Sequence, residues 1–191
     1  MTATAGPPSV RVRDARPGDL ARIREIYAHH VAHGLSSFEE VPPDLVEMGR
    51  RFEALVGEGL PYLAADMTRP DGDIEVAGYA YAGRYRPRPA YRYTVENSVY
   101  VDPACQGGGV GRALLAALIE RCTALGYRQM VAVIGDSGNE PSIRFHEALG
   151  FAQVGTVTSV GFKFGRWVDS VIMQRPLGRG DRELPPPPTD D

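Results

Sequence analysis

A cluster of glycines stands directly in front of a run of strong helix formers, with Gly107, Gly108, Gly109 and Gly111 falling within five positions. The first backbone N–H groups of a helix are unpaired and carry a partial positive charge. Glycines in front of them allow positive φ and let a ligand approach the backbone closely. The stretch predicts an anion-binding turn of the kind that holds phosphates, with a turn that binds nothing as the alternative.

Two common nucleotide-binding motifs do not fit this glycine stretch. A P-loop would end in Gly-Lys-Ser/Thr, whereas Arg112 and Ala113 follow Gly111. A dinucleotide-binding fingerprint would have a third glycine where this chain has Leu114. Taken alone, the segment is therefore equally consistent with a glycine-rich turn that has no ligand.

Glu96 is a charged residue inside a run rich in valine and tyrosine, from Val95 to Val101. In a strand, alternation places Glu96, Ser98 and Tyr100 on one face and the residues between them on the other. Such a carboxylate can act as a general base through a water, and the alternative is a solvated glutamate on an exposed face.

Hydrophobic periodicity and turn residues predict the elements that position these groups. Strands are expected over residues 10–14, 61–66, 74–85, 91–101, 129–134, 151–160 and 168–174, and helices over 19–31, 43–56, 111–125 and 139–150. This order predicts an α/β fold with a mixed sheet. Strands joined by tight turns should pair antiparallel, and the strands on either side of the helix at Gly111 should pair parallel.

The 191 residues predict one folded domain over residues 10–177, with a flexible N-terminus over 1–9 and a disordered proline-rich tail over 178–191. A net charge of −3 gives no reason to expect nucleic acid or an anionic membrane as a partner. Cys105 and Cys122 are too few for a disulfide framework, and no metal site is expected. Without a signal peptide or an apolar run of about 18 residues, the expected location is the cytoplasm.

Two spaced motifs resemble the GNAT acetyltransferases. The segment Gln106–Gly111 resembles the family's Q/R-x-x-G-x-G/A signature, and Asn139, His146 and Gly150-Phe151 resemble its N-x(6)-Y-x(3)-G-F segment. The stretches "SSFEEVPP", "TVENSVYVDP", "VAVIGDSGNEPSIRFHEALGF" and "GFKFGRWVDSVIMQR" are similar to the phosphinothricin and methionine sulfoximine N-acetyltransferase subfamily. The resemblance covers about residues 10–177 and implies a GNAT-type mixed sheet flanked by helices on both faces.

The resemblance implies acetyl-CoA as cosubstrate and the α-amine of a small amino acid or analogue as acceptor. It implies that the backbone of Val99, Tyr100 and Val101 bonds the pantetheine amides as an added strand would. The pyrophosphate would be held by backbone N–H groups of Gly107, Gly108, Gly109, Val110, Gly111 and Arg112. Asn139 would bond the pantetheine arm, and helix capping is a second role open to it.

His146 stands where most GNAT enzymes have a tyrosine that is proposed to protonate the departing thiolate. The resemblance leaves four roles open for it: general acid, base working with Glu96, hydrogen-bond donor to the thiolate, or a purely structural contact. We expect Glu96 and His146 to be the catalytic pair, without assigning the acid and the base.

The arginines between Gly83 and Tyr93 predict an anionic acceptor, because guanidinium groups suit carboxylates and phosphinates, with solvated loop arginines as the alternative. By resemblance, Arg86, Arg88 and Phe38 bind the acceptor, and we add Tyr93 and Ser98 to this set. The resemblance also implies a homodimer. Acetylation of a peptide N-terminus or a polyamine, or a non-catalytic acyl-CoA-binding module, are the competing functions.

Overall fold

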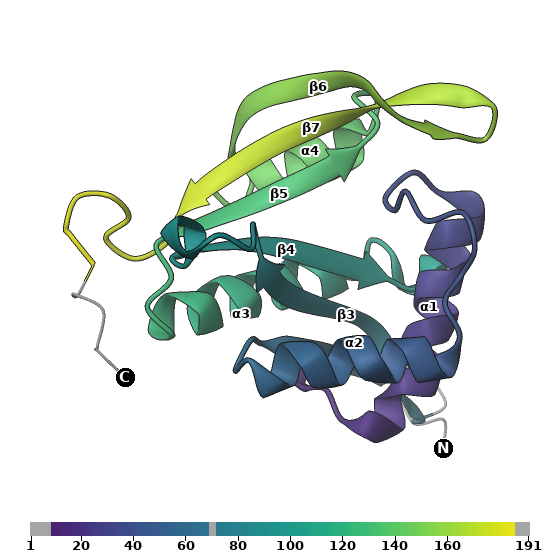
Figure 1. Cartoon of the computed structure of the whole chain (residues 1–191). Helices are drawn as coiled ribbons and strands as arrows, with labels where there is room; N and C mark the ends of the chain where they lie inside the picture. Colours follow the sequence, from purple (N-terminus) through teal and green to yellow (C-terminus); the bar gives the residue numbers. More distant parts are fainter. Residues whose placement is uncertain (1–8, 69–71, 186–191) are drawn as a thin grey trace.

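The computed structural model describes residues 9–68 and 72–185, and it contains one seven-stranded mixed sheet (Figure 1). The strand order is β1-β2-β3-β4-β5-β7-β6. The strands are β1 (Val10–Asp14), β2 (Tyr62–Thr68), β3 (Ile74–Arg84), β4 (Thr94–Val101), β5 (Gln129–Gly135), β6 (Ala152–Lys163) and β7 (Arg166–Pro176). Only β4 and β5 pair parallel within this part of the chain, which confirms the predicted mixed sheet.

Four helices cover the two faces of the sheet, as predicted: α1 (Leu20–His33), α2 (Leu45–Gly57), α3 (Val110–Ala124) and α4 (Glu140–Glu147). One buried cluster joins α1 and α2 to the sheet through residues such as Ile23, Phe52 and Tyr79. The other joins α3 to the opposite face through Leu114, Leu118 and neighbouring side chains. The alternating faces of β3 and β4 thus supply both cores.

Most expected boundaries lie within three residues of the observed ones, and two of the differences have a clear position in the chain. The strand expected from Tyr91 begins at Thr94, because Pro89–Tyr91 form a 3-10 turn with proline in its first position. The strand expected to end at Val160 continues to Lys163 in β6. Gly150, with φ of 83°, closes the turn after α4 where the sequence predicts a glycine cap.

The predicted tails lie largely outside the described residues, which begin at Ser9 and end at Pro185. In the described part of the C-terminal tail, the N–H of Gly180 donates to Leu177 O at 2.8 Å, and Arg179 pairs with Glu183 at 2.6 Å. The flexible N-terminus over 1–9 and the disordered tail over 178–191 stay predictions. Within the described ranges, no helix is both long and apolar enough to cross a membrane.

Candidate active site

The parallel pair β4–β5 separates after three residues and opens a cleft. Pairing runs only from Thr94–Gln129 to Glu96–Val131, and β5 then continues beside β7 while β4 continues beside β3. Figure 1 shows the two strands diverging toward the end where α1 lies. The cleft between them has a volume of about 890 Å³, within the range of small-molecule sites.

One wall of the cleft is the free edge of β4. The N–H of Asp102 donates to Ala77 O at 2.8 Å, so the backbone of Asp102 faces β3. Because alternate residues of a strand face the same neighbour, the backbone of Tyr100 also faces β3, whereas that of Val99 and Val101 faces the cleft. His30 donates from Nε2 to Val101 O at 2.8 Å, and the other groups of this edge can pair with an added strand-like ligand.

The same wall continues into the glycine turn, residues 106–111, which leads into α3. Gly107 and Gly109 have φ of 78° and 81°, and Gly109 is the left-handed residue at which α3 begins. No side chain caps this helix start, so its first N–H groups face the cleft uncapped. The open edge and the uncapped helix start fit an extended amide chain that ends in a diphosphate.

Glu96 and His146 reach the cleft from opposite faces of β4. Glu96 is half-buried on the face that carries Ser98, and burial raises the pKa of its carboxyl while Arg86 acts in the opposite direction. His146 is 6% exposed on α4, and its Nε2 lies 3.2 Å from Oδ1 of Asn97, which belongs to the other face of β4. Both side chains line the same cleft because the strands separate between them.

His146 is enclosed by neighbours of its own helix and by aromatic rings. Its Nδ1 lies 2.8 Å from Ser142 O, and the ring of Phe151 meets it edge-on at 5.2 Å. Burial lowers the pKa of His146, and the bond to Ser142 opposes that shift. The sequence pointed to His146 but not to Asn97, whose only signal was a polar residue on the valine-bearing face of the strand.

Asn139 caps α4, because its Oδ1 accepts from the Ser142 N–H at 3.3 Å. The same residue lines the cleft, so capping leaves the expected role toward pantetheine open. The cleft also contains most of the other expected site residues: Phe38, Glu96, Ser98, Val99, Tyr100, Val101, Gly107, Gly109, Val110, Gly111, Arg112 and His146. Gly108, Arg86, Arg88 and Tyr93 lie outside its lining.

Comparison with known proteins identifies this architecture. Residues 12–172 match the model of the acetyltransferase (GNAT) domain. The chain belongs to the GNAT acetyltransferase family. It is 55% identical to a phosphinothricin N-acetyltransferase from Alcaligenes faecalis over 91% of this chain and 86% of that protein. It is 44% identical to an L-methionine sulfoximine/L-methionine sulfone acetyltransferase from Pseudomonas paraeruginosa, over 87% of this chain and 94% of that protein.

A solved structure shares the whole GNAT fold. It is a phosphinothricin acetyltransferase from Sinorhizobium meliloti in complex with acetyl-CoA, 47% identical, with a TM-score of 0.87 over 93% of both chains. The expected family and fold are therefore confirmed, and acetyl-CoA is the cosubstrate of this chain too. Among the described residues, no group of histidine, cysteine and acidic side chains is arranged to hold a metal ion.

The second wall of the GNAT cleft is the segment 34–38, which follows α1 and packs against β5 and β6. A Cβ atom at Gly135 would lie 1.8 Å from Leu35 O, and one at Gly161 would lie 2.4 Å from the ring of Phe38. Each glycine therefore makes room for one residue of this segment. Phe38, 41% exposed, is held at the mouth of the cleft as a result.

Lys163, the last residue of β6, holds this wall in place through three hydrogen bonds. Its Nζ donates to Val31 O at 2.8 Å, to Gly34 O at 2.9 Å and to Ser37 O at 2.7 Å. Lys163 is 2% exposed, and burial lowers the pKa of its ammonium group. Sequence alone does not reveal the role of this residue, because its three partners lie more than 120 positions away in the chain.

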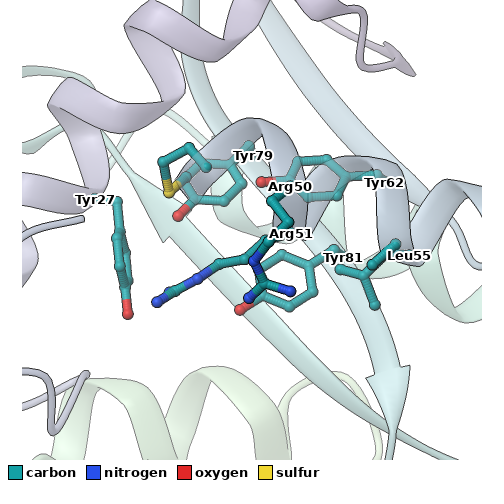
Figure 2. A pocket seen from close by; sticks show the side chains of 9 residues that line it. Tyr27, Arg50, Arg51, Leu55, Tyr62, Tyr79 and Tyr81 are labelled. Atoms are coloured by element: carbon teal, nitrogen blue, oxygen red, sulfur yellow. The ribbon is translucent and has the colours of Figure 1, made fainter. Parts of the chain in front are cut away.

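A smaller pocket of about 270 Å³ lies between α2 and the sheet (Figure 2). Its lining residue Tyr81 pairs with Ser98, so the pocket lies on the face of the sheet that carries Glu96 and Ser98. Its lining joins Arg51 to a group of tyrosines, namely Tyr27, Tyr62, Tyr79 and Tyr81. Arg51 is held by Glu39 and Glu47 at 2.6 and 2.7 Å. Tyr81 is the neighbour of Ser98 across the β3–β4 pair, so the pocket borders the cleft.

Proposed function

We propose that this GNAT acetyltransferase moves the acetyl group of acetyl-CoA to the α-amine of a small amino acid or analogue of the phosphinothricin and methionine sulfoximine type. The observation that carries the proposal is the meeting of three features in one cleft: the free edge of β4, the uncapped start of α3 and the half-buried Glu96. The activities named for the relatives in Alcaligenes faecalis and Pseudomonas paraeruginosa support the acceptor class.

The residues of the first wall suit the cosubstrate. We assign the pantetheine amides to the backbone of Val99 and Val101, and the diphosphate to the N–H groups between Gly107 and Arg112. Bound acetyl-CoA supplies a thioester that is reactive toward a neutral amine. The protein's part is to orient the two substrates and to manage the protons.

Glu96 is assigned as the group that receives a proton from the amine, through a water. An α-amine needs only about 1.4 kcal/mol to lose its proton at pH 7, so one carboxylate is sufficient help. Partial burial raises the pKa of Glu96, which makes it a stronger base than a solvated glutamate. The Glu96 side chain lies on the same face of β4 as Ser98 and on the opposite face from Asn97, and we assign the acceptor to this side of the cleft.

The carboxylate of the acceptor is assigned to Arg86 and Arg88, with Phe38 beside it. Both arginines are exposed on the segment that leads into β4, and the Arg86 guanidinium stacks 4.7 Å from the centre of the Tyr85 ring. Arg86 is close enough to Glu96 to influence its pKa. An acceptor bound there would place its anionic group at the rim and its amine toward Glu96.

Thiol release from acetyl-CoA tests this function with a panel of amines. Phosphinothricin, methionine sulfoximine and methionine sulfone are expected to turn over, and spermidine and a peptide with a free N-terminus are expected to be poor acceptors. Preference for spermidine or the peptide would overturn the acceptor class. Acetyl-CoA binding by calorimetry without turnover of any amine would instead support a non-catalytic module.

We further propose that the protein is a homodimer through the β6–β7 hairpin. Five apolar side chains of this hairpin, its turn included, are 53–64% exposed: Val154, Val160, Phe162, Phe164 and Trp167. Light scattering after gel filtration should give twice the chain mass, and Trp167→Glu should halve it, whereas Leu125→Glu on the far end of α3 should not. A monomeric wild type would overturn this. Cys105 and Cys122 are not joined in a disulfide, which suits a reducing compartment such as the cytoplasm.

A further inference from the structure

Both ring nitrogens of His146 face oxygen atoms of the protein. Nδ1 lies 2.8 Å from Ser142 O, the carbonyl one turn earlier on α4. A carbonyl oxygen only accepts hydrogen bonds, so Nδ1 carries a proton. Nε2 lies 3.2 Å from the side-chain oxygen of Asn97. The state of the second nitrogen therefore depends on which way the Asn97 amide is turned.

The orientation of Asn97 follows from its other partner. Its Nδ2 donates to Val131 O at 3.1 Å, on the first part of β5. Turning the amide over would place two acceptor oxygens against each other at that point. Asn97 is 7% exposed, so water gives little compensation for a lost bond. The amide nitrogen therefore stays on Val131, and the amide oxygen stays on His146.

We propose that Asn97 is a positioning residue that keeps a proton on Nε2 of His146, so that His146 is the proton donor of the reaction and Glu96 is the proton acceptor. The catalytic part of this proposal rests on the proposed function. Before attack, Glu96 takes one proton from the ammonium group through the water. As the neutral amine bonds to the acetyl carbon and the carbon–sulfur bond breaks, the nitrogen releases its second proton to solvent. The Nε2 proton of His146, held by Asn97 until then, passes to the sulfur, and solvent restores it.

Two influences oppose each other at His146. Burial lowers its pKa, and the bond to Ser142 O raises it. The contact of Nε2 with the acceptor Oδ1 of Asn97 and the place of His146 in the last turn of α4 also favour the cation. The charged side chains on the elements packed around His146 either bond to other groups or lie on faces that do not meet its ring. Glu96 lies on the opposite face of β4, Arg144 pairs with Glu140, Glu147 is exposed, and Arg175 donates to Leu149 O. Asn97 is thus the side chain through which the protonation of Nε2 can be changed.

Nitrogen-15 NMR of the histidine side chains tests the proposal without any amine present. The chain has four histidines, and His146→Gln assigns the signal of interest. Asn97→Leu removes the acceptor at similar volume, and Asn97→Asp strengthens it. We expect the pKa of His146 to fall by at least one unit in Asn97→Leu and to rise in Asn97→Asp. The matched control Glu147→Gln, on the exposed face of α4, should leave that pKa in place.

The pH profile of kcat supplies the second readout. Loss of the Nε2 proton should produce the basic limb, which moves to lower pH in Asn97→Leu and to higher pH in Asn97→Asp, while acetyl-CoA binding changes less than about threefold. Should Asn97→Leu fail to fold, Asn97→Asp against wild type decides by the same shift. An unchanged His146 pKa in these variants, or a wild-type Nε2 without a proton at every pH, would overturn the proposal. Failure of every amine to react would overturn the proposed function and leave the NMR result standing.

Discussion

The two walls of the cleft are built in different ways. The wall to which we assign the cosubstrate, called here the cosubstrate wall, consists of one continuous segment, β4 followed by the glycine turn and the start of α3, and it presents mainly backbone groups. The wall to which we assign the acceptor, called here the acceptor wall, consists of segment 34–38 held by Gly135, Gly161 and Lys163, which come from distant parts of the chain. A wall of local backbone groups would suit a cosubstrate that the whole family shares, and a wall assembled from distant parts of the chain can change with the acceptor.

Glu96 lies between the two walls, and its replacement should have the largest effect. Glu96→Gln keeps the size and removes the base, so we expect kcat to fall by about 10² to 10⁴. The dissociation constant of acetyl-CoA should change little, because Val99 and Val101 present backbone groups. Steady-state kinetics and calorimetry measure the two quantities, with Glu147→Gln as an exposed control. Near-normal turnover in Glu96→Gln would remove this residue from the chemistry.

Gly135→Ala should damage the acceptor wall alone. The new methyl group would lie 1.8 Å from Leu35 O, which is backbone and must move. Such overpacking costs about 1–3 kcal/mol of unfolding free energy, and it should displace Phe38. We expect the KM for the amino acid to rise at least tenfold while acetyl-CoA binding stays within about twofold. In the control Gly155→Ala, on β6, the methyl group meets nothing within 4 Å and both values should hold.

Gly109→Ala is the matching change on the cosubstrate wall. Gly109 has φ of 81° and open space around a Cβ, so the cost is conformational, about 1–2 kcal/mol. The turn should shift and weaken acetyl-CoA binding roughly tenfold, with the KM for the amino acid little changed. Calorimetry with coenzyme A measures the first value. If Gly109→Ala and Gly135→Ala both raised the same constant, the division into two walls would be wrong.

This difference also explains what could be predicted from sequence. The order of strands and helices, the parallel pair and the glycine turn follow from periodicity, glycine spacing and local turns, and the structure has them. Lys163 and Asn97 were missed because their roles arise from partners such as Ser37 and His146, brought together only by folding. Likewise, alternation placed Glu96 and Asn97 on opposite faces, but it did not show that strand separation lets both faces reach one cleft.

The smallest expected effect concerns the charge at the rim. Arg86 lowers the pKa of Glu96 and burial raises it, with burial the larger influence. The acidic limb of kcat/KM should therefore lie above the ordinary glutamate value, and Arg86→Gln should move it to higher pH by less than about one unit, since Arg86 is exposed and screened by salt. Because the pKa of Glu96 is higher in the folded state than in the unfolded state, the protonated carboxyl contributes to the free energy of unfolding at low pH. This contribution is lost as the pH rises from the ordinary glutamate pKa through the raised pKa of the folded state.

Arg88→Gln is the matched control for this shift. Arg88 is equally exposed but does not contribute to the pKa of Glu96, so its replacement should change the KM for the amino acid without moving the limb. Repeating the Arg86→Gln profile at high salt should shrink its difference from wild type, because screening removes the same interaction. A limb that moves equally in both variants would mean that substrate ionisation, rather than Glu96, produces it.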